Sequence, residues 1–339
     1  MIILPQIPSN PPVLRRTPGA TKAPQPIPTH PRMLAITMLL LILAASAPST
    51  DSAFAASTPG DKKIGVLIVS HGSRSETWRA ALQDLGARVR GPIVAGGRVA
   101  DVRSAFMEYT EPSIATRLKE FDHEGYTDVV VMPVFLTVSP HPFDDIPTIM
   151  GQKTDPHSLE TLRLEGIERY TPRARTHMTP LMDFTDLIQR NVERRVRELS
   201  QKPAEEGLVL VAYGDETYER EWSTLLIRIG EHVRRTTGVS VMSHAWCGHI
   251  VRYDPARTTD AIETVLRQRR NAIVIPVLVA RDERFQVKLI GDGISRVAGS
   301  RERVRYRPDA ILPDSGLERW IVDTARQSAK RISSEVAAR

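Results

Sequence analysis

One order of elements occurs twice along this chain, and it restricts the fold more than any other feature of the sequence. In the first half, short apolar runs rich in β-branched residues alternate with segments whose apolar residues recur at helical spacing. The predicted strands cover residues 64–69, 101–107 and 129–136. Strands that alternate with helices are typical of a parallel sheet with helices on both faces. We therefore predict an α/β fold.

The second half repeats this order, again with a glycine after the first apolar run and a proline within the third. Gly72 precedes Pro133 by 61 positions, and Gly214 precedes Pro276 by 62. This agreement indicates a tandem duplication of about 130 residues per unit. The apolar runs of the second unit cover residues 207–213, 239–246 and 272–279. The two units are predicted to be domains, each with a small parallel sheet, at residues 62–200 and 207–335.

Several residues have the chemistry of helix termini. Ser75 is predicted to be the N-cap of the first helix. Pro112 suits the first turn of the second helix, and Gly125 is predicted to end that helix. Asp144 and Asp145 are candidates for a third metal ligand, but we favour a role in capping the next helix.

Residues that bind metals or protons follow each predicted strand of the first unit. His71 comes directly after the first strand, Glu108 and Glu111 follow the second, and His141 follows the third. Ligands of open parallel sheets bind beyond the carboxyl ends of the strands, so these residues are expected to converge. Neutral imidazole is a good ligand for Co²⁺, Ni²⁺, Fe²⁺ or Zn²⁺. Two histidines make an open site, which suits transfer of a metal better than its storage.

Transfer of a metal to an acceptor that must lose protons also needs a base. His71 is a candidate for this role, and Glu108 and Glu111 are candidates for proton acceptors or charge partners. These two glutamates are equally well explained as surface carboxylates near a helix N-terminus, where negative charge is favoured. Ser73 and Arg74 are candidates for binding a substrate carboxylate with free backbone N–H groups. Arg74 is nearly as well explained as a solvated side chain.

The two units differ where chemistry is expected. His71 aligns with Tyr213, and His141 aligns with Arg284. The second unit therefore keeps the apolar pattern and loses both imidazoles. A purely structural role for the histidines does not predict this loss, whereas a single functional site per chain does.

Composition and the first residues limit the class of protein. The net charge of +6 is too small to predict nucleic-acid binding, and the single Cys247 excludes an intrachain disulfide or a cysteine-cluster metal site. Residues 1–61 are predicted to be a leader and linker. Its apolar run at 34–45 is too short for a typical membrane span of about 20 residues. With Ala-Phe-Ala at 53–55, it predicts a secretory signal and export, whereas a mis-assigned start predicts a cytoplasmic protein.

Three motifs carry a resemblance to a known family. They are His-Gly-Ser-Arg at 71–74, Phe-Met-Glu-Tyr-Thr-Glu-Pro-Ser-Ile at 106–114, and Met-Pro-Val-Phe-Leu followed by His and Asp-Ile-Pro at 132–147. In this order and spacing, the chain resembles the class II sirohydrochlorin chelatases, the cobaltochelatases and ferrochelatases of cobalamin and sirohaem synthesis. The resemblance covers residues 64 to about 195. The second half is similar to the degenerate second unit of the family's two-domain members.

The resemblance implies a chelatase-type, flavodoxin-like fold in both domains. It implies that His71 and His141 bind the metal and that His71 accepts a proton. It also implies that Glu111 and one loop contact the tetrapyrrole. That loop comprises Val134, Phe135, Leu136, Thr137, Val138 and Ser139. Many relatives have a glycine before the second histidine, whereas this chain has Pro140, which stiffens the loop.

The leading hypothesis is insertion of Co²⁺, or alternatively Fe²⁺ or Ni²⁺, into sirohydrochlorin or a close relative, with release of two protons. The metal is then a substrate, and no permanently bound cofactor is expected. A second hypothesis is an exported protein that binds metal or tetrapyrrole without turnover. A third is a hydrolase similar to the histidine phosphatases, but those place an arginine directly before the histidine, where this chain has Ser70.

Overall fold

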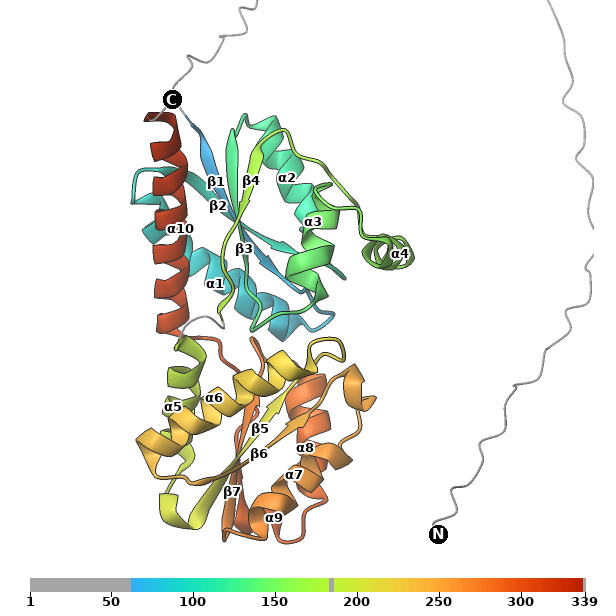
Figure 1. The fold of residues 1–339 in the computed structure, drawn as a ribbon, viewed down its shortest axis with the longest axis vertical. Coiled ribbons are helices and arrows are strands. Elements are labelled where there is room, and N and C mark those ends of the chain that lie inside the picture. The colour runs from blue at the N-terminus through green and yellow to red at the C-terminus, as the bar shows by residue number, and fades with distance from the viewer. Residues whose placement is uncertain (1–61, 183–185, 338–339) are drawn as a thin grey trace, which may run out of the picture. The chain divides into compact units, whose positions relative to one another are not determined.

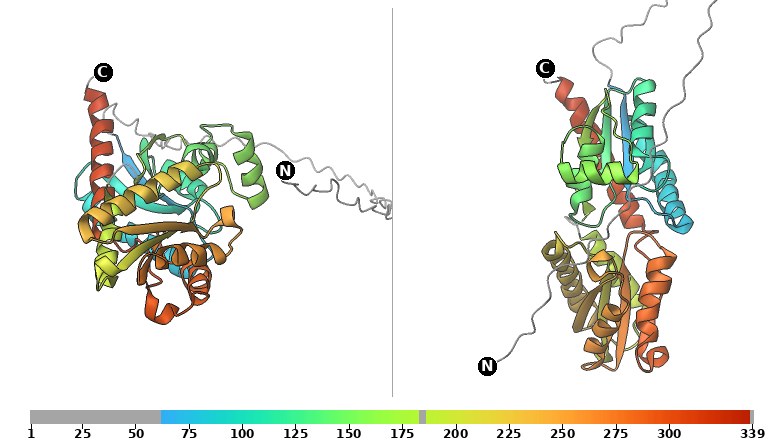
Figure 2. Two further views of the ribbon diagram at one scale, coloured as in Figure 1. Left: turned by 60° about the horizontal axis from the view of Figure 1, so that its bottom comes forward. Right: turned by 90° about the vertical axis from the view of Figure 1, so that its right-hand side faces the viewer.

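The computed structural model describes residues 62–182 and 186–337. Its first lobe is a sheet of four parallel strands in the order β2-β1-β3-β4, covered by helices on both faces (Figure 1, Figure 2). The strands are β1 (Ile64–Ser70), β2 (Val99–Phe106), β3 (Asp128–Pro133) and β4 (Arg175–Met178). The helices that follow these strands within the first lobe are α1 (Glu76–Val94), α2 (Ile114–His123), α3 (Ile146–Ile149) and α4 (Pro156–Glu165).

The second lobe repeats this topology with four parallel strands in the order β6-β5-β7-β8. The strands are β5 (Glu206–Ala212), β6 (Val241–Trp246), β7 (Asn271–Val277) and β8 (Val304–Tyr306). The helices between them are α6 (Glu219–Thr237), α7 (Ala256–Leu266), α8 (Gly291–Ser295) and α9 (Ser300–Arg303). The identical strand order confirms the predicted α/β fold with two tandem units.

The predicted strands agree with the observed ones to within two residues at each end, except for the third. The range 129–136 was expected, but β3 ends at Pro133. One further backbone hydrogen bond, from Val134 N to the carbonyl of Val69 at 2.7 Å, follows Pro133, and the chain leaves the sheet after it. The apolar character of residues 134–136 reflects burial beside the sheet, not membership of it.

The helix termini were predicted correctly in two of three cases. Ser75 is the N-cap of α1 and its hydroxyl accepts a hydrogen bond from Trp78 N, as expected. Gly125, with φ of 74°, follows the end of α2. Pro112, however, does not lie in the first turn of α2. The N-cap is Ser113, whose hydroxyl accepts from Thr116 N, so the proline precedes the cap.

Two helices do not pack against the sheet that precedes them in the chain, but against the other lobe. Helix α5 (Leu187–Leu199) follows the first sheet but packs against α6 and β7. Helix α10 (Ser315–Ala337) follows the second sheet but packs against α1 and β3 (Figure 1). The predicted domain limits at 62–200 and 207–335 follow the chain, whereas the packing crosses them. One continuous apolar cluster therefore includes residues of both lobes.

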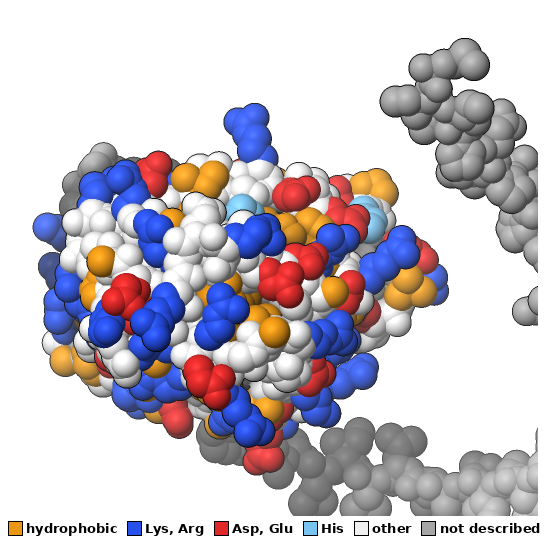
Figure 3. All heavy atoms as spheres, turned by 90° about the horizontal axis from the view of Figure 1, so that it is seen from below, with side chains coloured by type: hydrophobic (Ala, Val, Ile, Leu, Met, Phe, Trp, Pro, Cys, Tyr) orange, Lys and Arg blue, Asp and Glu red, His pale blue; other side chains and the backbone are white. Residues whose placement is uncertain are grey.

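The predicted leader at 1–61 and its cleavage site lie outside the described residues, so export stays a prediction. Among the helices of the described part, none is long and apolar enough to cross a membrane. On the face seen from below in Figure 1, basic and acidic side chains are interspersed (Figure 3).

Arg195 in α5 provides a test of the packing of α5 against the second lobe. Its side chain is 1% exposed, donates to the carbonyl of Pro276 at 2.8 Å and pairs with Asp309. We expect Arg195→Ala to lower the free energy of unfolding by about 3 kcal/mol, because it leaves these buried partners unsatisfied. Urea unfolding measures this loss. The control Arg194→Ala, at the exposed neighbouring position, should cost less than about 1 kcal/mol.

Candidate metal site

The carboxyl ends of three neighbouring strands bring His71, Glu108 and His141 together, as the sequence predicted. His71 directly follows β1, and its backbone carbonyl accepts a hydrogen bond from Glu108 N at 3.2 Å, just beyond β2. His141 opens a π-helical turn, His141–Asp145, beyond β3. The centroids of the two imidazole rings are 4.7 Å apart, in an edge-to-face arrangement. The two rings are therefore near enough to share one ion.

Gly72 is required for this close approach of β1 and β2. Its φ is 89°, and a Cβ atom there would lie 2.1 Å from the carbonyl oxygen of Glu108. Any other residue would push the second strand end away and separate Glu108 from His71. The glycine of the His-Gly-Ser-Arg motif thus has a steric role in positioning the site.

His71 and Glu108 form a half-buried ion pair. His71 Nε2 lies 2.9 Å from Glu108 Oε1, and the glutamate side chain is 6% exposed. Burial lowers the pKa of His71, but the hydrogen bond and charge of Glu108 outweigh burial and raise this pKa overall. Burial likewise raises the pKa of Glu108, and the contact with His71 outweighs it, so this pKa is lowered. The pair therefore favours a protonated imidazole on an ionised carboxylate.

His141 is oriented by a buried carboxylate. Its Nδ1 lies 2.7 Å from Asp145 Oδ2, and the other carboxylate oxygen accepts from the hydroxyl of Ser158 at 2.5 Å. Burial raises the pKa of Asp145, but its hydrogen bonds with His141 and Ser158 lower it overall. This arrangement leaves Nε2 of His141 to bind a metal, which is the usual way in which a second carboxylate fixes a histidine ligand.

The predicted capping role of these aspartates is wrong for Asp145. It makes no side-chain hydrogen bond to the N-terminus of α3, because the π-helical turn places its carboxylate against the ring of His141. Asp144 instead forms an ion pair with Lys153. No group of three or more His, Cys, Asp or Glu side chains within residues 62–182 and 186–337 is arranged to hold a metal ion. The geometry thus resembles the open pair that the sequence indicated.

Sequence reasoning missed Glu165 and Tyr109. Glu165, at the end of α4, hydrogen-bonds Glu108, and this contact raises the pKa of Glu165 to about 7. Tyr109 is 52% exposed, has a φ of 67°, and its ring centroid lies 6.1 Å from that of His71. No regular spacing in the sequence indicates that Glu165 lies beside Glu108. Tyr109, in contrast, directly follows Glu108 and lies within the motif at 106–114.

The predicted tetrapyrrole-binding loop is mostly buried. Phe135 is the loop residue whose ring lies against both histidines, with centroid distances of 6.5 Å to His71 and 5.8 Å to His141. The carbonyl of Val138 accepts from the indole of Trp222 in the second lobe at 3.2 Å. The side chains that are at most 5% exposed are Val134, Leu136, Thr137 and Ser139.

The other predicted substrate contacts occupy different surroundings. Glu111 is exposed, and its carboxylate accepts from Ser113 N at the start of α2. Burial raises its pKa, but this N–H and nearby hydroxyls together outweigh burial and lower the pKa overall. Ser73 donates its hydroxyl to Asp282 in the second lobe at 2.9 Å. Arg74 is exposed, and its guanidinium lies 5.4 Å from the ring centroid of Tyr109.

The second lobe has a different set of side chains at the equivalent place. Tyr213 directly follows β5, and Arg284 lies in a π-helical turn, Glu283–Ile290, beyond β7. The hydroxyls of Tyr213 and Tyr253 are 3.2 Å apart, and the guanidinium of Arg284 lies 4.3 Å from the ring centroid of Tyr253. The residues aligned with the two histidines thus occupy corresponding positions in the repeated fold.

Comparison with known proteins finds similarity to one protein family. A CbiX family model matches residues 65–199. The sirohydrochlorin cobaltochelatase of Methanococcoides burtonii is 33% identical over 101 residues, which cover 29% of this chain and 71% of the relative. That of Methanosarcina barkeri is 31% identical over 108 residues, covering 31% of this chain and 76% of the relative.

Solved structures show the same fold over more of the chain. The sirohydrochlorin chelatase SirB from Bacillus subtilis subspecies spizizenii, in complex with cobalt, has a TM-score of 0.55 at 16% identity, covering 79% of this chain and 96% of that one. The similarity therefore extends over both lobes. A chelatase-like multi-domain protein from Deinococcus radiodurans has a TM-score of 0.51 at 16% identity, covering 78% of this chain and 54% of that one.

The His71–Glu108 pair predicts a measurable change in protonation. In Glu108→Gln the negative charge is lost, so the pKa of His71 should fall from its raised value, because burial then dominates. An NMR titration of the His71 ring measures this pKa. An unchanged pKa for His71 in the variant would show that the ion pair does not form in solution.

Proposed function

The chain belongs to the CbiX family of sirohydrochlorin chelatases, and we propose that it inserts a divalent metal into sirohydrochlorin or a close relative. Cobalt is the favoured metal because the relatives are named cobaltochelatases, with Fe²⁺ and Ni²⁺ as alternatives that imidazole also binds. Two protons leave the macrocycle for each metal that enters. The observation that carries the proposal is the pair of imidazoles with centroids 4.7 Å apart, each held by its own carboxylate.

His141 is proposed as the constant metal ligand. Asp145 occupies Nδ1, and Ser158 in turn fixes this carboxylate, so Nε2 has a defined direction before any metal arrives. A ligand that is already oriented loses little conformational freedom on binding. The metal is a substrate that passes through the site, so a weak set of two imidazoles is suitable.

His71 is proposed to alternate between metal and proton at a single atom. Its Nδ1 lies 3.2 Å from the carbonyl oxygen of Gly72, which favours a proton on Nδ1. Nε2 is then free for the metal in the neutral ring. When the metal moves to the macrocycle, Nε2 accepts one of the two pyrrole protons, the other passes to solvent, and Glu108 stabilises the resulting imidazolium.

The tetrapyrrole is proposed to lie over Phe135 and Tyr109, whose rings flank the histidines. The buried residues Val134, Leu136, Thr137 and Ser139 are proposed to support this surface and keep Phe135 in place. Glu111, exposed at the start of α2, is proposed to contact the edge of the macrocycle.

Substitution of the two histidines tests this proposal. With metal-free sirohydrochlorin and Co²⁺, Fe²⁺ or Ni²⁺, the wild-type protein should accelerate insertion, as followed in the visible spectrum. His71→Ala should lower kcat/KM by about 100-fold or more, because both a ligand and a general base are lost. His141→Ala should raise KM for the metal, because one ligand is lost. Circular dichroism should show that both variants are folded.

The matched control is His123→Ala, which removes an exposed histidine at the end of α2. Its rate should equal that of the wild-type protein. Insertion by His71→Ala or His141→Ala at the wild-type rate would refute the site assignment. Stoichiometric binding of metal and tetrapyrrole without any acceleration would refute chelatase turnover itself.

A further inference from the structure

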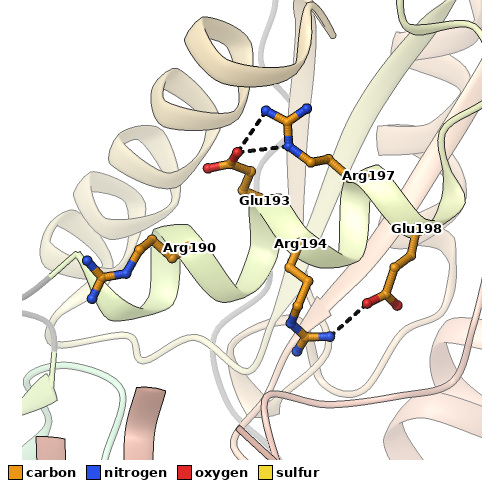
Figure 4. A pocket seen from close by; sticks show the side chains of 5 residues that line it. All are labelled: Arg190, Glu193, Arg194, Arg197 and Glu198. Carbon is orange, nitrogen blue, oxygen red and sulfur yellow. Dashed lines mark hydrogen bonds and ion pairs between the residues drawn. The ribbon is translucent and has the colours of Figure 1, made fainter. Parts of the chain in front are cut away.

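One pocket on the surface is lined by arginines whose side chains form ion pairs with neighbouring carboxylates. This pocket lies on α5 and is lined by Arg190, Glu193, Arg194, Arg197 and Glu198 (Figure 4). Arg197 pairs with Glu193 at 2.8 Å, and Arg194 pairs with Glu198 at 2.9 Å. Internal ion pairs of this kind satisfy the guanidinium groups, so the pocket gives no indication of an anionic ligand.

Arg284 is in a different situation. Within the described parts of the chain, no carboxylate lies within ion-pair distance of it, and its guanidinium lies over the rings of Tyr253 and Phe285 at 4.3 and 5.8 Å. Arg74 in the first lobe has the same character, over Tyr109. A stacked guanidinium keeps its planar set of donors available and is well suited to bind a carboxylate with two hydrogen bonds.

The segment that carries Arg284 is attached to the residues that follow His71. Asp282 accepts a hydrogen bond from Ser73 at 2.9 Å, and Glu283 accepts from Ser75 at 3.0 Å and from Thr77 at 2.8 Å. These three bonds join the turn of the second lobe to the start of α1. The backbone next to Arg284 is therefore fixed relative to the metal site rather than free to move away.

The residue aligned with His71 lies beside the same aromatic side chains as Arg284. The hydroxyls of Tyr213 and Tyr253 are 3.2 Å apart, and the ring centroid of Tyr213 lies 5.5 Å from that of Phe285. The two residues that align with the histidines are therefore gathered around Tyr253 and Phe285.

We propose that Arg284, seated on Tyr253, binds a carboxylate of the tetrapyrrole and makes the chain selective for a polycarboxylate macrocycle. This inference rests on the proposed chelatase function and names a specificity-determining residue for it. The second unit has lost its imidazoles but keeps the π-helical turn that holds the residue at the end of the sheet. The position that aligns with the proposed metal ligand His141 is thus occupied by Arg284, which is proposed to bind an anionic group.

Equilibrium binding of metal-free sirohydrochlorin, followed by quenching of intrinsic fluorescence, tests this inference without turnover. Arg284→Ala should raise Kd about tenfold, as expected for loss of a charge-assisted hydrogen bond. Arg284→Lys should retain part of the affinity. The matched control Arg301→Ala removes an exposed arginine of α9, which precedes β8 and so lies at the opposite edge of the sheet. Its Kd should not change.

A second probe separates charge from shape. The methyl ester of sirohydrochlorin has no carboxylates, so wild-type protein and Arg284→Ala should bind it equally. In insertion assays, Arg284→Ala should raise KM for sirohydrochlorin while KM for Co²⁺ and kcat stay unchanged.

The possible outcomes distinguish the inference from the proposed function. An unchanged Kd in Arg284→Ala, or an equal loss in Arg301→Ala, would overturn the inference while leaving chelatase activity intact. A tenfold loss of binding in a protein that inserts no metal would support the inference and refute turnover. Failure of the wild-type protein to bind sirohydrochlorin would overturn both.

Discussion

The position of β1 between β2 and β3 is the constraint on which the site depends. Ser70 pairs with Phe106 on one side, and Val69 pairs with Pro133 on the other, so all three strands end at one edge. The ladder continues past the strands where Glu108 N bonds the carbonyl of His71. Parallel register thus converts three distant stretches of sequence into one cluster. A shift of one residue would turn these side chains to the opposite face of the sheet.

The duplicated unit packs against the one that carries the histidines. The lobes share an apolar cluster, and α5 and α10 each pack across the boundary set by chain order. Contacts at the site reinforce this association, because Ser73 bonds Asp282 only two residues after His71. The second unit is therefore more than a remnant. Its replacement of imidazole by Tyr213 and Arg284 is consistent with a division of labour between metal chemistry and substrate recognition.

The sequence predicted those parts of the structure that local rules determine. The pattern of apolar residues located six of the eight described strands, and the Gly72–Pro133 spacing located the repeat, because buried parallel strands and tight turns restrict residue type. The π-helical turn was not predictable from periodicity, so the contact between Asp145 and His141 was mistaken for a helix cap. The contact of Glu165 with Glu108 and the packing of α10 against the first lobe depend on residues far apart in the chain. Such contacts leave no spacing signal in a single sequence.

The central claim is that metal and proton compete for Nε2 of His71. It is tested most directly by the protons released when Co²⁺ binds in weakly buffered solution at pH 6.5, the ordinary pKa of histidine. Because Glu108 raises the pKa of His71 above its ordinary value, more than half of the rings are protonated at this pH, and binding should release more than half a proton per Co²⁺. His71→Ala should release none. Equal release by both proteins, or no release by the wild-type protein, would contradict the account.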